Sequence, residues 1–466
     1  MQRGGFNCHR SPFWSLSPET LVMSTIRSGL LLTVLMGMCW GTIESADWPR
    51  FRGPNGSGVT DDSAPVSWSV TSNLKWKLEL PGRGVSSPVV VGDKVFVTCY
   101  SGYGIPGQEG DIANLKRHLV CVERSNGTVL WTAAVPATLP EDPYTPPGVS
   151  AHGYASHTPV CDGKRVFVFF GKSGVLAFDM EGKQLWQHLV GQESGRMRWG
   201  SAASPILFGD SVIVNASDES EALVALDQQT GEEKWRAEAS GMASSWSTPV
   251  LVQHGDATEL VLTVPGEVWS FFPETGKLKW YAPGTNDQTM SASPVPGAGV
   301  VYAIGGRGGN SVAIRTGGKG DAADHLLWEG SASGRFATPA LHNGYLYTNN
   351  GAIALCYNAA TGERVYQDRL TGVRSAAPTV ADEDPRPRGG RGFGGGDYAS
   401  PIIANGKVYI TLKSGLVHVL EAQPEFKVLA TNDLTADSSG FDGTPAVSNG
   451  QLFLRSHAFL YCLQDE

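Results

Sequence analysis

Residues 204–235 read SPILFGDSVIVNASDESEALVALDQQTGEEKW, and this stretch contains one complete unit of a repeating β pattern. A Ser-Pro pair opens a short apolar run, and Gly209-Asp210 supplies a two-residue turn before a second β-rich run. A third run ends in a Thr-Gly turn that precedes Trp235. Gly and Asp tolerate the positive φ angles that tight hairpin turns require, so the unit predicts four consecutive antiparallel strands.

From residue 47 onward, a Ser/Thr-Pro pair that opens a short apolar run, as in this unit, occurs eight times. Successive prolines are 71, 46, 44, 45, 45, 62 and 44 residues apart, and a period near 45 is typical of four-stranded propeller blades. We therefore predict an all-β fold, an eight-bladed β-propeller in which each pair precedes the innermost strand of a blade. The pairs are Ser87-Pro88, Thr158-Pro159, Ser204-Pro205, Thr248-Pro249, Ser293-Pro294, Thr338-Pro339, Ser400-Pro401 and Thr444-Pro445.

The large residue that ends the unit recurs as the expected anchor of each outermost strand. The last repeat finishes with residues 459–463, before an outermost strand can form, and residues 73–80 can supply that strand. Such an exchange closes the ring and leaves no unpaired strand edge at the seam. The eight expected anchors are Trp76, Trp131, Trp186, Trp235, Trp280, Trp328, Tyr366 and Leu429.

These repeats resemble the pyrroloquinoline-quinone (PQQ)-like β-propeller repeat family, and the resemblance extends from residue 47 to the C-terminus. That family includes quinoprotein dehydrogenases and the propeller lipoprotein of the bacterial outer-membrane assembly machinery. The resemblance therefore implies the fold and leaves several functions open. The segment 48–58, WPRFRGPNGSG, also resembles the start of secreted bacterial members that have no assigned activity.

The composition fits one large β domain over residues 47–466. The chain has 466 residues, of which 41% are hydrophobic and 17% charged, and its 58 glycines and 28 prolines suit many short turns. The formal net charge of -9 argues against a nucleic-acid partner, because such partners are polyanions.

The N-terminus is expected to direct export. The apolar run at residues 29–41 is too short to span a bilayer but has the size of a signal-peptide core, so we expect a signal peptide over residues 1–46. Translation from Met23 would give a signal of ordinary length. The residue before Cys39 is Met38 rather than a small residue, which disfavours an outer-membrane lipoprotein. We expect a periplasmic or extracellular protein with no transmembrane segment after signal removal.

Five cysteines remain after position 47, and an odd number does not suggest a disulfide framework. Three of them, Cys121, Cys356 and Cys462, align with Ala225 of the unit, so we expect buried small residues. A Cys99–Cys121 pair facing across neighbouring strands is the alternative.

Residues 381–397 read ADEDPRPRGGRGFGGGD and are expected to form a disordered loop. Their composition contains too few apolar side chains to contribute to a core.

The candidate ligand-binding residues come just before the Ser/Thr-Pro pairs. Innermost strands begin there, so these residues should surround one mouth of the central channel. They are a mixture of polar and aromatic residues that is typical of pockets and interfaces. Trp199 and Trp246 could alternatively plug the channel. The candidates are His152, Tyr154, His157, Trp199, Trp246, Arg335, Tyr398 and Asp442.

The sequence favours an exported, non-catalytic binding or scaffolding propeller, a monomer without a cofactor that recognises a protein or a polysaccharide at the channel mouth. The resemblance implies two alternatives. One is a PQQ- and Ca²⁺-dependent oxidoreductase, in which Trp199 or Trp246 would stack on the cofactor and Arg335 would pair with its carboxylates. The chain lacks the adjacent cysteine pair that many such enzymes carry. The other alternative is a partner in outer-membrane protein assembly.

Overall fold

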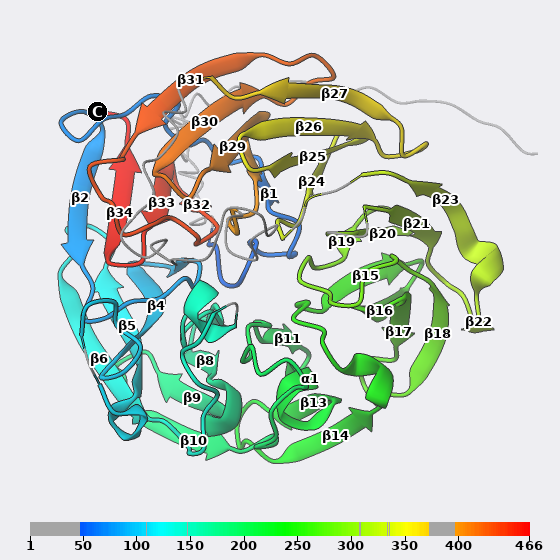
Figure 1. Cartoon of the computed structure of the whole chain (residues 1–466), viewed down its shortest axis with the longest axis horizontal. Helices are drawn as coiled ribbons and strands as arrows, with labels where there is room; N and C mark the ends of the chain where they lie inside the picture. The colour runs from blue at the N-terminus through cyan, green and yellow to red at the C-terminus, as the bar shows by residue number, and fades with distance from the viewer. Residues whose placement is uncertain are drawn as a thin grey trace, which may run out of the picture. The chain divides into compact units, whose positions relative to one another are not determined.

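The computed structural model describes residues 47–466 apart from residues 109, 147, 307–308, 333, 335 and 372–396. The described residues form eight antiparallel sheets, arranged as blades around a central axis (Figure 1). Each blade has four strands, here called A to D from the axis outward, and two blades carry a short fifth strand. The predicted eight-bladed all-β propeller is confirmed.

The first four blades follow the chain order. Their strands, from A to D, are β3 (Val89–Val91), β4 (Lys94–Ser101), β5 (Lys116–Glu123) and β6 (Val129–Pro136) in blade 1; β7 (Val160–Cys161), β8 (Arg165–Phe169), β9 (Val175–Asp179) and β10 (Gln184–His188) in blade 2; β11 (Ile206–Phe208), β12 (Ser211–Ala216), β13 (Ala222–Asp227) and β14 (Glu233–Glu238) in blade 3; and β15 (Val250–His254), β16 (Ala257–Val264), β17 (Glu267–Phe271) and β18 (Leu278–Pro283) in blade 4.

The other four blades complete the ring. Their strands, from A to D, are β19 (Val295–Pro296), β20 (Val300–Ile304), β21 (Ser311–Arg315) and β23 (Leu326–Gly330) in blade 5; β24 (Ala340–His342), β25 (Tyr345–Asn350), β26 (Ile353–Asn358) and β27 (Arg364–Arg369) in blade 6; β28 (Ile402–Ala404), β29 (Lys407–Thr411), β30 (Leu416–Glu421) and β31 (Val428–Asp433) in blade 7; and β32 (Ala446–Ser448), β33 (Gln451–Arg455), β34 (Phe459–Gln464) and β2 (Leu74–Glu79) in blade 8. The fifth strands are β22 (Gly320–Asp321) beside β18 and β1 (Val59–Thr60) beside β28.

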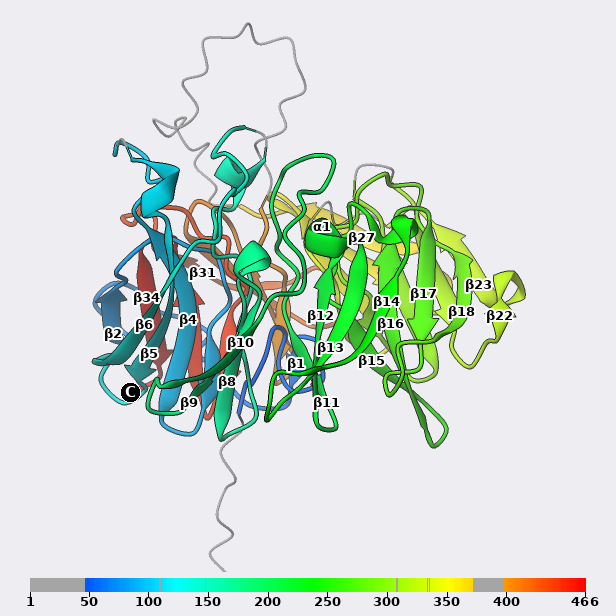
Figure 2. The same ribbon diagram turned by 90° about the horizontal axis from the view of Figure 1, so that it is seen from below.

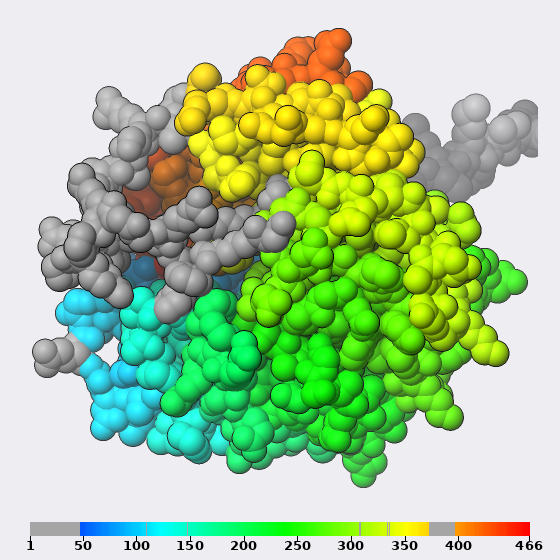
Figure 3. All heavy atoms as spheres, turned by 45° about the vertical axis from the view of Figure 1, so that its right-hand side comes forward, coloured from blue at the N-terminus to red at the C-terminus, as the bar shows by residue number. Residues whose placement is uncertain are grey.

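The hydrophobic core is divided into layers between neighbouring blades. Phe96 of blade 1 packs in one layer with Phe178 of blade 2, and Phe167 of blade 2 packs in the next layer with Val214 of blade 3. Side chains fill the spaces between the ribbons of blades 3 to 6, coloured green to yellow in Figure 3. Each blade therefore depends on both neighbours for the burial of its two faces.

The ring closes through an exchange between its N- and C-terminal segments. β2 pairs antiparallel with β34, with Trp76 opposite Cys462, and so supplies the outermost strand of blade 8. Figure 1 shows the blue β2 beside the red β34. The closure predicted from the incomplete last repeat is confirmed.

A tryptophan on strand D connects most blades to the next one. Trp235 of blade 3 stands opposite Ala225, its ring lies against Gly276 in the turn of blade 4, and its Nε1 donates to the Pro273 carbonyl at 3.0 Å. The same type of bond, 2.9–3.1 Å long, joins Trp76 to Arg124, Trp131 to Met180, Trp186 to Gln228 and Trp328 to Ala359. Trp280 differs, because its Nε1 donates to Glu259 Oε2 in its own blade at 2.7 Å.

Leu429 is not the anchor of blade 7. The register places Ala430 opposite Val419 and Val428 opposite Leu420, so Leu429 is the extra residue of a β-bulge. Its side chain is exposed. The prediction was wrong because the position opposite Val419 holds the small Ala430 in place of a large anchor, while the bulge itself also occurs in blades such as blade 3.

The hydroxyl groups of the Ser/Thr-Pro pairs form a belt around the axis. The Ser204 amide donates to Thr248 Oγ1 of the next blade at 2.9 Å, and the Thr248 amide donates to Ser293 Oγ at 3.1 Å. Further links of 2.9–3.0 Å run from Ser87 to Thr158, Thr158 to Ser204, Ser293 to Thr338, Thr338 to Ser400 and Ser400 to Thr444. The hydroxyl satisfies a strand-end amide of its neighbour, which explains why the repeat uses Ser or Thr at this position.

Residues 47–60, here called the N-terminal strap, cross the central channel. At one end Trp48 bridges to Val90 of β3, and the Pro49 carbonyl accepts from the Cys161 amide of β7 at 2.9 Å. At the other end β1 pairs in parallel with β28 of blade 7. Because the strap pairs with A strands beyond their Ser/Thr-Pro pairs, it lies on the far side of the belt from the candidate residues.

Arg52 attaches the middle of the strap to blades 6 and 7. Its Nη1 donates to the carbonyls of Thr338 and Pro401 at 3.0 and 3.1 Å, and its Nη2 donates to the Pro339 and Ser57 carbonyls at 2.6 and 2.7 Å. Burial lowers the pKa of Arg52 to about 9. The side chain is therefore held by backbone carbonyls of the ring rather than by solvent.

The five cysteines of the described chain are buried and free. Cys121 and Cys462 stand opposite Trp131 and Trp76, as the alignment with Ala225 predicts, and Cys99 stands opposite His118 rather than Cys121. The possible Cys99–Cys121 pair is therefore not formed.

The remaining expectations concern segments that the structure covers only in part. The expected signal peptide over residues 1–46, with Met23 and Cys39, lies outside the described residues, as does nearly all of the expected loop at 381–397. No helix within the described residues has the length and hydropathy needed to cross a bilayer.

Candidate functional site

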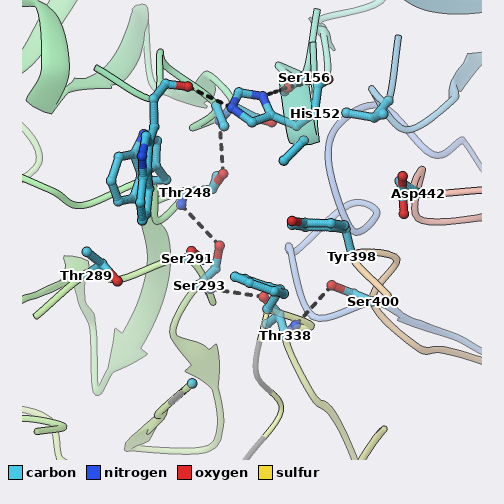
Figure 4. Close-up of a pocket in the computed structure, with 18 of the residues that line it drawn as sticks. His152, Ser156, Thr248, Thr289, Ser291, Ser293, Thr338, Tyr398, Ser400 and Asp442 are labelled. Atoms are coloured by element: carbon cyan, nitrogen blue, oxygen red, sulfur yellow. Dashed lines mark hydrogen bonds between the residues drawn. The ribbon is translucent and has the colours of Figure 1, made fainter. Parts of the chain in front are cut away.

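A cavity of about 580 Å³ occupies the axis of the ring. All eight serines and threonines of the belt line it, and Phe51 of the strap contributes to its lining. The strap crosses the channel at one end, so the cavity opens toward the loops that precede the A strands. Figure 4 shows many of the lining residues, with the amides of Thr248 and Ser293 donating to the hydroxyls of Ser293 and Thr338.

One wall of the cavity carries two stacked indole rings. Trp199 and Trp246 precede blades 3 and 4, with ring centroids 5.4 Å apart and planes inclined by 26°. The Trp246 Nε1 donates to the Gly200 carbonyl at 2.6 Å and to Asp218 Oδ2 at 2.9 Å. Both acceptors lie at the edge of the indole and fix its orientation, and one face of the ring stacks on Trp199.

His152 holds the first of these tryptophans by its backbone. The His152 Nε2 lies 2.9 Å from the Trp199 carbonyl, and Nδ1 lies 2.6 Å from Ser156 Oγ. A carbonyl only accepts, so Nε2 carries the proton and Nδ1 accepts from the serine. Burial lowers the pKa of His152 below its ordinary value. The neutral ring therefore acts as a fixed support for Trp199.

A second aromatic pair belongs to blades 6 and 7. The rings of Phe336 and Tyr398 stack with centroids 4.6 Å apart and planes inclined by 20°. The Lys413 Nζ lies 5.8 Å from the centroid of the Tyr398 ring. In a ring of eight blades, blades 3 and 7 stand on opposite sides, so the two aromatic pairs line different walls.

Asp442 supplies a carboxylate to the wall of blade 8. Its Oδ2 accepts from His457 Nε2 at 2.7 Å and lies 3.7 Å from Lys413 Nζ. Burial alone would raise the pKa of Asp442, but the hydrogen bond from His457 and the charge of Lys413 lower it below its ordinary value. The carboxylate is therefore ionised at neutral pH.

A buried polar network lies behind the Trp199–Trp246 wall. The His157 Nε2 lies 2.9 Å from Ser201 Oγ, and a small pocket is lined by His157, Tyr154 and Glu219. Burial raises the pKa of Asp218 to about 7 and, together with the charge of Asp218, raises that of Glu219 to about 8. Burial lowers the pKa of His157 well below its ordinary value. Glu219 and His157 are therefore mainly uncharged at neutral pH, whereas Asp218 is about half ionised.

The structure brings five of the eight candidate residues to the cavity lining: His152, Trp199, Trp246, Tyr398 and Asp442. Tyr154 and His157 lie behind the wall, where the Tyr154 hydroxyl donates to the Asp142 carbonyl at 2.6 Å. Arg335 lies outside the described residues.

Several lining residues were not among the candidates. Asn286, Asp287, Gln288, Thr289 and Ser291 precede blade 5 at the same offset as the candidates of other blades, so the same positional rule would have found them. No comparable signal marks Phe51 or His457, because the strap and a hairpin of blade 8 bring them to the site.

The described lining provides part of what PQQ would require. The aromatic pairs suit a flat ring, and Arg335, the residue expected to pair with the carboxylates of PQQ, lies outside the described residues. Within the described residues, no group of three or more His, Cys, Asp or Glu side chains is placed to hold a metal ion.

A family profile described as outer membrane protein assembly factor BamB matches residues 101–217 and 192–368, which together cover more than half of the chain. No curated protein matches the sequence.

Among solved structures, BamB from Moraxella catarrhalis is similar with a TM-score of 0.55 and 13% identity, over 84% of this chain and 97% of that chain. The quinohemoprotein alcohol dehydrogenase from Comamonas testosteroni gives a TM-score of 0.59 and 12% identity, over 90% of this chain and 80% of that chain. At these identities the likeness shows a shared propeller fold and does not choose between a binding protein and an enzyme.

Proposed function

This chain belongs to the PQQ-like β-propeller family described as outer membrane protein assembly factor BamB, and we propose that it is a non-catalytic binding propeller whose central cavity takes a glycan-like ligand. The observation that supports the proposal is the cavity lining, in which two stacked aromatic pairs accompany a belt of hydroxyl groups. The volume of about 580 Å³ lies within the range of small-molecule sites, about 300 to 1,000 Å³.

The chemistry of a sugar matches both parts of this lining. Sugar rings have apolar C–H faces that pack on aromatic rings and peripheral hydroxyls that exchange hydrogen bonds with hydroxyls and carboxylates. A belt hydroxyl such as Thr248 Oγ1 accepts from a neighbouring amide, which leaves its own O–H hydrogen for a ligand. The two aromatic pairs supply the packing surfaces.

A peptide segment fits the cavity less well than a glycan. Recognition of an extended peptide by strand addition requires unpaired backbone amides. Amides at the belt, such as those of Ser204 and Thr248, already donate to the hydroxyl of the next blade. The strap also crosses the channel, so a chain cannot thread through it.

We place this activity outside the cytoplasm, in the periplasm or the extracellular space. The expected signal peptide and the family described as an outer-membrane assembly factor support this location. The same family match favours a second candidate function, a role as a partner in outer-membrane protein assembly. That role would use an outer surface of the propeller and need not involve the cavity.

The experiment is calorimetric titration of protein beginning at Asp47 with maltose, cellobiose and diacetylchitobiose. We expect at least one of them to bind, and Trp199→Ala and Trp246→Ala to weaken that binding about tenfold or more, because each removes a stacking surface. Trp269→Ala is the matched control, since Trp269 lies on β17 away from the cavity and donates to Glu267. Its affinity should equal that of the wild type.

Two outcomes would replace the proposal. Absence of binding by all three disaccharides at millimolar concentration, combined with co-purification of outer-membrane assembly proteins, would favour the second candidate. Tight binding of PQQ in the presence of Ca²⁺ with dye reduction would favour the oxidoreductase suggested by the family resemblance.

A further inference from the structure

Asp442 presents an unused acceptor at the wall of the cavity. The residue is only 5% exposed and lines the cavity, yet its Oδ1 has no hydrogen-bond partner within the described residues. A buried acceptor without a partner is destabilising, and more so when the group is charged. A ligand that donates to Oδ1 would remove this cost.

Arg83 and His457 hold Asp442 in its ionised form. The Arg83 Nη2 lies 2.8 Å from His457 Nδ1, and an arginine only donates, so Nδ1 is the unprotonated nitrogen. The other nitrogen, Nε2, therefore carries the proton that it donates to Asp442 Oδ2. These two hydrogen bonds fix the plane of the Asp442 carboxylate and leave Oδ1 as the atom that can accept from a ligand.

The charged side chains of the described lining are both acidic. Asp287 also lines the cavity, with Oδ2 accepting from the Gly306 amide at 2.6 Å, and the described lining contains no lysine or arginine. The faces of the two aromatic pairs carry partial negative charge. Arg52 is not among the lining residues, and its terminal nitrogens are engaged by backbone carbonyls. A ligand with donors or positive charge is therefore favoured over an anion.

We propose that Asp442 is a specificity-determining residue of the central cavity, which selects neutral and amino sugars and rejects sugar acids. Asp442 Oδ1 would accept from a ligand hydroxyl or ammonium group while the ring stacks on an aromatic pair. A carboxylate on the ligand would be repelled by the ionised Asp442, because neither group carries a proton to form a hydrogen bond between them. This inference rests on the proposed glycan-binding function and specifies the class of sugar.

The test uses three ligands with one β-1,4-linked glucose skeleton: the glucosamine dimer, cellobiose and cellobiouronic acid. At pH 7 we expect the wild type to bind the glucosamine dimer about tenfold or more tightly than cellobiouronic acid, because charges about 4 Å apart interact by a few kcal/mol near a protein surface. Asp442→Asn should reduce that ratio to within about threefold. Asp210→Asn makes the same charge change on an exposed turn and should leave the ratio unchanged.

A second variant should change the ratio of the two affinities in the opposite direction. Lys413 is half exposed and lies 3.7 Å from Asp442, so Lys413→Gln should fold and should widen the preference for the aminated ligand. Tighter binding of cellobiouronic acid by the wild type, or an unchanged ratio in both Asp442→Asn and Lys413→Gln, would overturn the inference. If none of the three ligands binds, the inference fails, and binding of maltose would leave the proposed function standing.

Discussion

Glu219 is a buried carboxyl group whose protonation is linked to folding. Among the described residues its Oε2 has no hydrogen-bond partner, and the Ser201 hydroxyl interacts with both Glu219 and His157. Burial, together with the charge of Asp218, raises its pKa to about 8. In an unfolded chain the same group has a pKa of about 4.3, so the folded state holds the proton more tightly.

This difference predicts that stability falls as pH rises. Between about pH 4 and pH 8 the folded protein binds more protons at Glu219 than the unfolded chain, so the contribution present below pH 4 is lost progressively over that range. Glu219→Gln should flatten the dependence of the melting temperature on pH across this window. Glu232→Gln, on an exposed turn, is the control and should retain the wild-type slope. Equal slopes in all three proteins would show that Glu219 titrates at an ordinary pKa.

The belt is the element that joins the inner ends of neighbouring blades. Thr248→Val keeps the shape of the side chain but leaves the buried Ser204 amide without its acceptor. We expect the free energy of unfolding in urea to fall by about 1–3 kcal/mol. Thr248→Ser keeps the hydroxyl, so its free energy of unfolding should fall much less. A valine variant as stable as the serine variant would contradict a structural role for the hydroxyl.

The C–D turn is the element that receives the tryptophan of the preceding blade. Gly231 has a φ of +75°, and a Cβ at this position would lie 2.6 Å from Cδ2 of Trp186. Gly231→Ala should therefore lower the free energy of unfolding by about 3 kcal/mol, since left-handed strain and overpacking each cost about 1–3 kcal/mol.

The matched control for this turn is Gly209→Ala. Gly209 also has a positive φ of +55°, but a Cβ there would meet nothing within 4 Å. Gly209→Ala should therefore lower the free energy of unfolding only by the backbone strain, about 1–2 kcal/mol. If both variants lose the same stability by urea unfolding, then packing of the turn against Trp186 contributes nothing.

The sequence predicted blade elements well where a residue type has one local reason to recur. The Ser/Thr-Pro pairs marked the A strands because each hydroxyl satisfies a neighbouring amide, and Trp235 marked strand D because it faces the small Ala225. Leu429 was misassigned because the core-facing position of blade 7 holds Ala430, so no large residue marks it, and the nearest large residue is the exposed one beside it.

At the scale of the whole molecule, the ring depends on β2 to close it. A chain that begins at Leu80 lacks the strap and β2 and exposes the edge of β34. We expect this variant to elute from size-exclusion chromatography as oligomers, because an unpaired edge strand templates pairing with another chain. A chain that begins at Ser67 lacks the strap but keeps β2, and it should elute as a monomer. Monomeric behaviour of both chains would show that the seam tolerates an open edge.

The cavity was predictable only in part from the sequence. The positional rule placed His152, Trp199 and Trp246 at the channel mouth, because the start of each A strand fixes where the preceding residues lie. The direction of side chains in irregular loops is not encoded by the repeat, so Tyr154 and His157 turn away from the cavity. The strap crosses between blades that are far apart in sequence, and no periodic pattern predicts such a contact.

The strap also determines how a bound molecule would exchange. Because residues 47–60 cross one end of the channel, a ligand would enter and leave through the other mouth. A protein that docks over that mouth would lengthen the residence time of a bound ligand without contacting the ligand. The ligand would then have to bind before the partner protein docks. The order of binding, rather than a change in affinity, would determine whether the partner meets a filled or an empty propeller.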